Sequence, residues 1–148
     1  MLINLDTGIL LRLLDRNDPH HASIRQALRV TIGGDQAVSS PQNLAEFWNV
    51  CTRPASARGG FGLSVQETDR RVRVIERLFR VMPDSSAAYP LWRQIVVQQG
   101  VQGVQVHDAR LVAWMHAYGI TNILTLNAAD FARYPGITPL SPQDVLRP

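Results

Sequence analysis

The N-terminal segment constrains the fold more than any other part of the sequence. A short apolar run over residues 2–5 stops at Asp6-Thr7-Gly8, and a second apolar run follows over residues 9–14. A short apolar run bounded by turn residues is typical of a buried strand, and the second run predicts a helix. A strand that passes through a polar loop into a helix favours an α/β fold, and it places Asp6 at the end of a strand.

The rest of the chain alternates predicted helices with short predicted strands, whose ends are marked by capping residues, prolines and glycines. Helices are expected from Asp18-Pro19 to Gly33-Gly34, over 42–52, from a capping box at Ser64 to about 81, over 86–99, over 109–115 and over 127–134. Strands are expected over 36–39, 120–126 and 137–140. A chain of 148 residues fits one core, so residues 1–148 are predicted to form a single domain.

The composition excludes several kinds of chemistry. All 15 basic residues are arginine, which excludes a Walker P-loop and a Schiff-base enzyme because both need a lysine. The net charge of +3 is compatible with a polyanionic partner such as nucleic acid. The single cysteine, Cys51, offers neither an internal disulfide nor a zinc cluster. Without a secretory signal or an apolar run of membrane-spanning length, a cytoplasmic protein is expected, with no membrane partner.

Four acidic residues occupy positions that solvation alone does not explain: Asp6, Glu46, Asp108 and Asp130. In an open parallel sheet, residues that follow the strands meet in one crevice, and Asp6 and the Asn127/Asp130 pair occupy such positions. Crowded carboxylates repel each other, which raises their pKa values unless a cation neutralises them. Ligands that are all oxygen suit Mg²⁺ or Mn²⁺, so the sequence predicts a site for one of these ions.

Each of these features also has a structural explanation that the sequence leaves open. Asp6 and Asp108 could each cap a helix, since aspartate is a favoured capping residue. Glu46 could face solvent beside an apolar stripe. A row of arginines on the predicted helix after Ser64 could be a solvated face, paired with Glu67 and Glu76, or an RNA contact; its members are Arg70, Arg73, Arg77 and Arg80.

The order of four short motifs resembles a PIN domain, and the compact length resembles the VapC-type toxin ribonucleases of bacterial toxin–antitoxin pairs. The motifs are Leu5-Asp6-Thr7, Ala45-Glu46-Phe47, His107-Asp108-Ala109 and the segment 124–131. The resemblance extends from residue 2 to about residue 145. It implies a central parallel sheet flanked by helices on both faces.

The resemblance also implies roles for individual residues. Asp6, Glu46 and Asp108 match the first three acidic positions of the family, Asn127 matches the fourth, and Asp130 matches the acid of the Asp-Phe pair that follows. The implied catalytic set is Asp6, Glu46, Asp108 and Asp130, and the implied ligands of Mg²⁺ or Mn²⁺ add Asn127 to this set. Thr7 and Thr125 are similar to the hydroxyl residues that support the metal site. The chain departs from the family pattern at Gly8 and at the uncharged Asn127, which weakens the case for a second metal.

The implied activity is hydrolysis of an RNA phosphodiester bond, which leaves a 5′-phosphate and a 3′-hydroxyl. The implied partners are the RNA substrate, a small antitoxin protein that covers the groove, and a second copy of the chain in a homodimer. A phosphatase with an aspartate nucleophile would need a second acid at the position of Gly8, where there is none. A non-catalytic RNA-binding or partner-binding module of the same fold stays open as the alternative.

Overall fold

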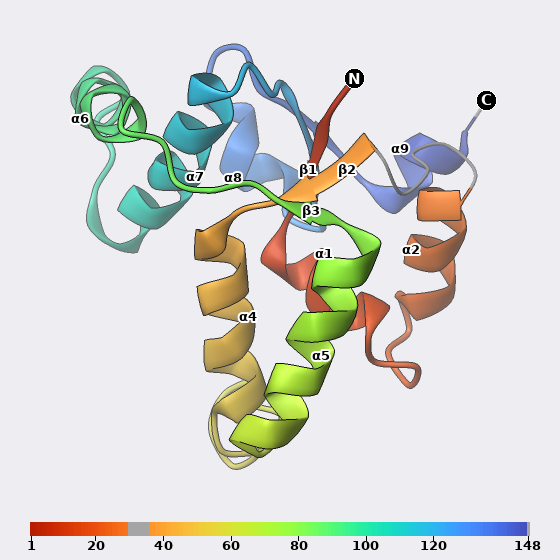
Figure 1. Cartoon of the computed structure of the whole chain (residues 1–148). Helices are drawn as coiled ribbons and strands as arrows, with labels where there is room; N and C mark the ends of the chain where they lie inside the picture. The colour runs from red at the N-terminus through yellow and green to blue at the C-terminus, as the bar shows by residue number, and fades with distance from the viewer. Residues whose placement is uncertain (30–35, 148) are drawn as a thin grey trace.

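The computed structural model of the protein describes residues 1–29 and 36–147. Its centre is a five-stranded parallel sheet with the order β3-β2-β1-β4-β5 (Figure 1). The strands are β1 (Ile3–Leu5), β2 (Ala37–Ser39), β3 (Arg80–Val81), β4 (Asn122–Leu124) and β5 (Thr138–Leu140). The predicted α/β class and parallel sheet are confirmed.

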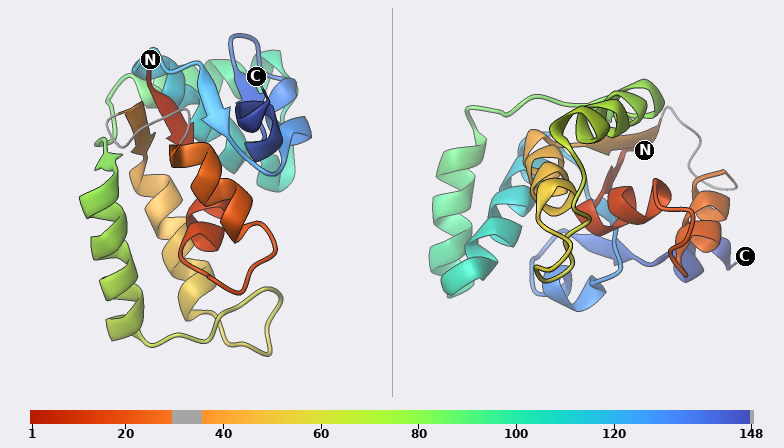
Figure 2. Two further views of the ribbon diagram at one scale, coloured as in Figure 1. Left: turned by 90° about the vertical axis from the view of Figure 1, so that its right-hand side faces the viewer. Right: turned by 90° about the horizontal axis from the view of Figure 1, so that it is seen from below.

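Helices cover both faces of the sheet, as predicted. They are α1 (Thr7–Leu13), α2 (His21–Ala27), α4 (Pro41–Thr52), α5 (Val65–Leu78), α6 (Ala88–Gln98), α7 (Val106–Ala117), α8 (Ala128–Ala132) and α9 (Pro142–Leu146), with a 3₁₀ turn, η2, at Gly103–Gln105. Helices α6 and α7 pack side by side at one end of the molecule, and α2 packs against α9 at the opposite end (Figure 2). Within the described residues, no helix combines the length and apolar content that crossing a membrane requires.

Alternation along the strands divides the interior into two cores. Ile3, Leu5 and Leu124 point to the face covered by α1, α2, α4 and α5. Val38 and Ile123 point to the face covered by α6, α7 and α8. Because side chains alternate between the faces of a sheet, this pattern requires strands that are buried on both sides. The two cores fix the carboxyl ends of β1 and β4 side by side.

Two predicted helix boundaries are wrong, for identifiable reasons. Asp18 does not cap α2, because its carboxylate accepts a hydrogen bond from the backbone N–H of His20 (2.8 Å) and the helix begins at His21. The predicted end of that helix at Gly33-Gly34 lies outside the described residues. Helix α5 ends at Leu78, before the predicted residue 81, because residues 80 and 81 form β3. A strand of two residues is too short to produce an alternating pattern.

The predicted row of arginines is only partly on α5, because Arg80 belongs to β3, and the part on α5 is ion-paired in part. Arg70 pairs with Glu67 (3.1 Å), as one alternative predicted, whereas Arg73 pairs with Asp69 (3.3 Å) and not with Glu76. Only half of the predicted capping box forms, since Ser64 accepts from the N–H of Glu67 while the Glu67 carboxylate binds Arg70. The exposed pairs are typical of a solvated helix face.

Candidate metal centre

The first carboxylate stands where two neighbouring strands end. Asp6 follows β1, and its backbone N–H donates to the carbonyl of Leu124, the last residue of β4 (3.0 Å). Thr125 follows β4, and its hydroxyl donates to Asp6 Oδ2 (2.7 Å). Asp6 also caps α1 by accepting from the N–H of Thr7 through Oδ1 (2.9 Å). The capping interpretation is therefore correct, and it coexists with a place at the carboxyl edge of the sheet.

Helix α4 brings Glu46 to the same edge. The Thr7 hydroxyl donates to Glu46 Oε2 (2.8 Å), and the amide of Gln42 donates to Glu46 Oε1 (3.0 Å). Glu46 is partly buried and faces α1, so the interpretation of a solvent-facing glutamate is wrong. Both oxygens of Glu46 have a donor in this arrangement.

Asp108 and Asp130 lie in the first turns of α7 and α8. Asp108 does not cap its helix, because α7 begins at Val106 and its N-cap residue is Gln105. The pKa of Asp108 is raised to about 6, mainly by burial and also by the negative charges of Asp6, Asp130 and Glu46, in that order. Asp6, Asp130 and Glu46 are therefore each near enough to Asp108 to influence its pKa.

The same coupling acts on Asp6. Burial raises the pKa of Asp6, hydrogen bonds from Thr125 and Thr7 oppose this rise, and the charges of Glu46 and Asp130 add to it. A buried carboxylate near two like charges is poorly stabilised in its ionised form. The site therefore concentrates negative charge that its own hydrogen bonds offset only in part.

Asn127 and Asp130 differ in how they relate to the other acids. Asn127 is exposed, it is the N-cap residue of α8, and its backbone N–H donates to the Thr125 hydroxyl (3.0 Å). Among the described residues, no hydrogen bond joins the side chain of Asn127 to a carboxylate. Asp130, although also exposed, influences the pKa values of both Asp6 and Asp108. The choice of a fourth ligand stays a prediction, and the electrostatics favour Asp130.

Sequence reasoning missed a buried polar chain beneath Glu46. Asn43, which is fully buried, donates from Nδ2 to the Thr7 hydroxyl (3.1 Å) and accepts from the Ser40 hydroxyl (2.8 Å). Gln42 joins Glu46 to the carbonyl of His107 at the start of α7 (2.7 Å). Asn43 and Gln42 are three and four residues before Glu46 on the same helix, and residues at that spacing share a helix face. This spacing was the sequence signal that could have identified them.

The donor set fits a hard divalent cation by its chemistry. Carboxylate and hydroxyl oxygens are the ligands that Mg²⁺ and Mn²⁺ take in proteins. Within residues 1–29 and 36–147, however, no three His, Cys, Asp or Glu side chains already stand in an arrangement that could hold an ion. Hydrogen bonds to Thr7, Gln42 and Thr125 hold the oxygens of Asp6 and Glu46. Side-chain rotation would therefore have to accompany binding.

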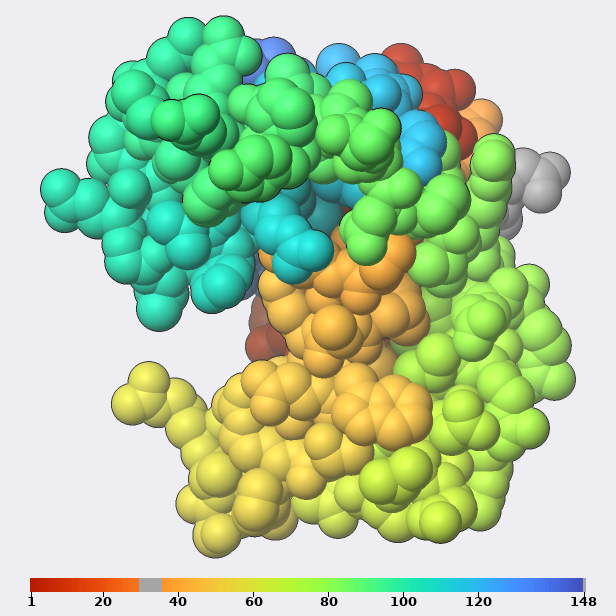
Figure 3. Space-filling model, turned by 60° about the vertical axis from the view of Figure 1, so that its left-hand side comes forward, coloured from red at the N-terminus to blue at the C-terminus, as the bar shows by residue number. Residues whose placement is uncertain are grey.

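The surface is hollowed on one side of the molecule. Figure 3 shows a recess between the teal segment that contains α6 and the yellow segment that ends α4, with red N-terminal residues at its floor. A recess of this open shape admits an extended polymer more easily than a closed pocket does.

Comparison with known proteins identifies the fold and the family. The chain is similar to VapBC2 from Rickettsia felis bound to a promoter DNA fragment (15% identity over 95% of this chain and 98% of that chain, TM-score 0.67). It is also similar to VapBC-1 from nontypeable Haemophilus influenzae (17% identity over 97% of this chain and 99% of that chain, TM-score 0.70). A third similar structure is Mycobacterium tuberculosis VapC20, a sarcin-ricin loop cleaving toxin (19% identity over 82% of this chain and 86% of that chain, TM-score 0.59). A search of curated proteins finds no match. The model of the PIN domain family matches residues 3–137, and the chain therefore belongs to the PIN domain family.

Proposed function

We propose that the protein is a metal-dependent endoribonuclease that hydrolyses RNA phosphodiester bonds. The observation that carries this proposal is that Asp6 and Asp108, both with raised pKa values, lie near enough to Glu46 and Asp130 to feel their charges. Burial and neighbouring carboxylates raise the pKa values of Asp6 and Asp108, and such an arrangement is costly to keep in a purely structural role. Their convergence in a member of the PIN domain family favours a catalytic one.

Asp6, Glu46, Asp108 and Asp130, with Asn127 as a further candidate, would hold Mg²⁺ or Mn²⁺. A bound ion of this kind supplies charge stabilisation to the phosphate and lowers the pKa of water. Thr125 and Thr7 orient Asp6 and Glu46 by donating to one oxygen of each. Asn43 in turn fixes the Thr7 hydroxyl from below. The supporting roles of Thr7 and Thr125 thus rest on contacts with the acids.

We further propose that the protein is the toxin of a type II toxin–antitoxin pair. One similar solved structure is a toxin–antitoxin complex from Klebsiella pneumoniae, in which the match covers 97% of the matched chain. A small antitoxin would mask the acidic groove, and a homodimer would be the assembly that it recognises. The free, buried Cys51 is compatible with the reducing cytoplasm that we expect as the location.

Cleavage of a mixed structured RNA pool tests the nuclease proposal. The purified protein would be assayed with Mg²⁺, with Mn²⁺ and with chelator, beside Asp6→Asn, Asp108→Asn and the exposed control Glu76→Gln. We expect cleavage that needs metal, that persists in the control and that disappears in both site variants while they stay folded. No cleavage, or cleavage that survives both site substitutions, would instead favour the non-catalytic binding module. Growth arrest on expression, absent for Asp6→Asn, would test the toxin role.

A further inference from the structure

A cavity separate from the recess adjoins the acidic site, on the side of α6. It has a volume of about 310 Å³ and lies between the start of α4, the loop after β3, the start of α6 and one side of α7. Its principal lining residues are Gln42, Asp84, Tyr89, Trp92, Arg110 and Trp114. This volume is at the lower end of the range for small-molecule sites, so the cavity suits one ring system more than a long segment.

Hydrogen bonds hold the walls of the cavity in place. Trp92 donates from its indole to the carbonyl of Val106 at the start of α7 (2.9 Å). Trp114 and Tyr118 both donate to the carbonyl of Pro83 (3.1 and 2.7 Å), which fixes the loop directly before Asp84. A wall that is already ordered loses little conformational entropy when a ligand binds.

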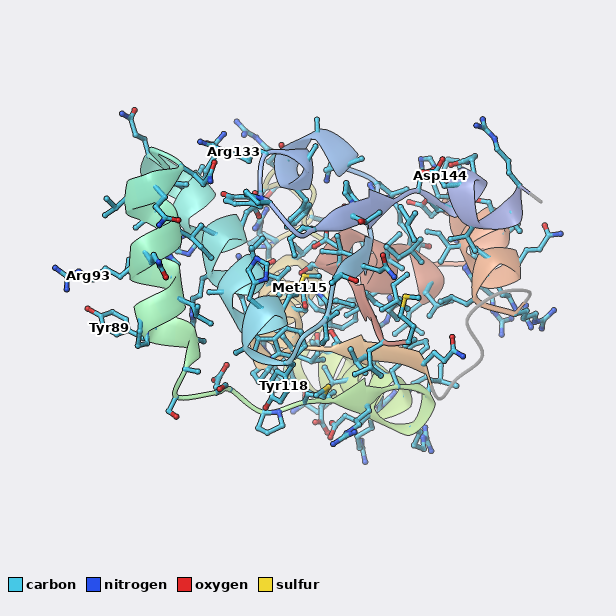
Figure 4. All side chains as sticks on the ribbon, turned by 90° about the horizontal axis from the view of Figure 1, so that it is seen from above. Tyr89, Arg93, Met115, Tyr118, Arg133 and Asp144 are labelled. Atoms are coloured by element: carbon cyan, nitrogen blue, oxygen red, sulfur yellow. The ribbon has the colours of Figure 1, made fainter. Side chains whose placement is uncertain are left out.

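The cavity combines aromatic faces with a cation. Tyr89 and Trp92 are stacked, with ring centroids 6.1 Å apart and planes inclined by 28°. Tyr89 is 67% exposed and extends outward from α6 at the rim (Figure 4). Arg110 is exposed on α7, and it makes no ion pair or hydrogen bond within the described part of the chain. Aromatic faces beside a free arginine are the combination with which proteins bind single-stranded nucleic acid.

Gln42 connects this cavity to the acids. Its Nε2 donates to Glu46 Oε1 and to the carbonyl of His107, and both are acceptors, so the orientation of the amide is determined. The remaining acceptor, Gln42 Oε1, is buried without a partner. A buried acceptor without a donor is costly, and a ligand that brings an N–H group would relieve this cost. Asp84 supplies a second acceptor in the same lining.

We propose that this cavity binds a purine base of the nucleotide next to the cleaved phosphodiester, stacked against Tyr89 and Trp92. The inference rests on the proposed function, because it assumes that RNA lies across the acids. The two-ring face of a purine covers more of Tyr89 and Trp92 than a pyrimidine ring does, and this larger stacking area is what favours a purine. The exocyclic amino group of adenine or guanine then faces the acceptors of Gln42 and Asp84, whereas uracil lacks an amino group and cytosine carries one on a smaller ring. Arg110 contacts the backbone phosphate and does not read the base.

Binding measured without turnover tests the proposal separately from cleavage. A fluorescently labelled octamer of uridine would be compared with octamers in which one central base is adenine or guanine, by anisotropy in chelator. The variants are Tyr89→Ala and Arg110→Gln, and the matched control is Arg147→Gln, an exposed arginine that follows α9 at the opposite end of the molecule from α6. All three positions are on the surface, so the fold should be retained.

We expect the wild type to prefer the octamers that contain a purine. Tyr89→Ala should remove this preference and weaken purine binding by roughly 5-fold to 150-fold, the effect of losing one stacked base. Arg110→Gln should weaken all octamers alike and reduce the dependence of affinity on salt by about one phosphate contact. Arg147→Gln should bind as the wild type does.

Two outcomes would overturn the proposal. Equal binding of all octamers by the wild type would show that no base is read. If Tyr89→Ala and Arg110→Gln bind as the control Arg147→Gln does, the cavity does not contact RNA. Metal-dependent cleavage together with either outcome leaves the nuclease proposal standing. A purine preference lost in Tyr89→Ala, in a protein that never cleaves RNA, would instead support the base site and refute the nuclease.

Discussion

The electrostatic cost of the acidic site can be measured as a change in stability. Burial and three neighbouring carboxylates raise the pKa of Asp108 from 3.8 to about 6. A raised pKa means that folding favours the protonated form, so this stabilising contribution is complete below pH 3.8 and is lost as the pH rises through about 6. At pH 7.5 the folded protein therefore carries an ionised Asp108 that destabilises it. Asp108→Asn removes that charge.

The magnitude follows from the size of the pKa shift. A shift of about 2 units corresponds to about 3 kcal/mol, at 1.36 kcal/mol for each unit. Asp108 is only partly buried, so solvent screening reduces this value to about 1.5 kcal/mol. The charge also lies in the first turn of α7, where the helix dipole favours an anion by about 0.5 kcal/mol. We therefore expect Asp108→Asn to be about 1 kcal/mol more stable than the wild type at pH 7.5.

Urea unfolding in chelator at pH 4 and pH 7.5 provides the assay, because bound metal would neutralise the same charge. Asp108→Asn should increase the free energy of unfolding at pH 7.5 and leave it nearly unchanged at pH 4. Asp144 is a control of opposite sign, because hydrogen bonds from Ser141 lower its pKa. Its stabilising contribution is present above pH 3.8 and is lost only at lower pH, so Asp144→Asn should lose stability at both pH 4 and pH 7.5. If Asp108→Asn gains nothing at pH 7.5, or gains equally at both pH values, the carboxylates do not repel one another as inferred.

Three further predictions test the site and its surroundings. Thr7→Val should destabilise the protein by about 1 to 3 kcal/mol by leaving buried polar partners without hydrogen bonds, whereas Thr7→Ser should not; equal urea midpoints would contradict this. Tyr134→Phe should unfold at an equal or higher urea concentration, because its buried hydroxyl lacks a partner, whereas Tyr118→Phe should lose about 1 kcal/mol with its hydrogen bond to Pro83. In thermal unfolding, Mn²⁺ should raise the Tm of the wild type and of Asn127→Ala but not of Asp130→Asn. A rise in the Tm of Asp130→Asn but not of Asn127→Ala would make Asn127 the ligand.

The fold was predictable because its signals are local and strong. The apolar run before Asp6 and the segment that contains Ile123 and Leu124 predicted β1 and β4, and their parallel pairing follows from the helices between them. Pro139 did not prevent β5 from forming, because β5 is an edge strand and can lack one backbone donor. In contrast, β3 was missed because two residues carry no periodicity. Sequence therefore predicted the elements that bury side chains on both faces.

Convergence of the acids was predictable only where the sheet determines it. Asp6 follows a strand, so its place at the carboxyl edge is a consequence of topology. Glu46 lies within α4, and its direction depends on how α4 packs against α1, which no local pattern specifies. For this residue the solvent-facing interpretation was equally compatible with the sequence. The family resemblance supplied the information that periodicity could not.

Ser40 and Asn43, which sequence reasoning missed, act together with the predicted Thr7 behind the acidic residues. Ser40, Asn43 and Thr7 form a continuous chain of hydrogen bonds that ends on Glu46, and in such a chain each bond polarises the next. Through this series of hydrogen bonds Glu46 accepts from a neutral hydroxyl at a position that a cation could otherwise occupy. Thr125 supplies the same kind of neutral donor to Asp6. Neutral donors of this kind reduce the repulsion without removing the charge that a cation would bind. Polar residues behind the acids, and not the acids alone, should therefore determine how tightly a metal is held.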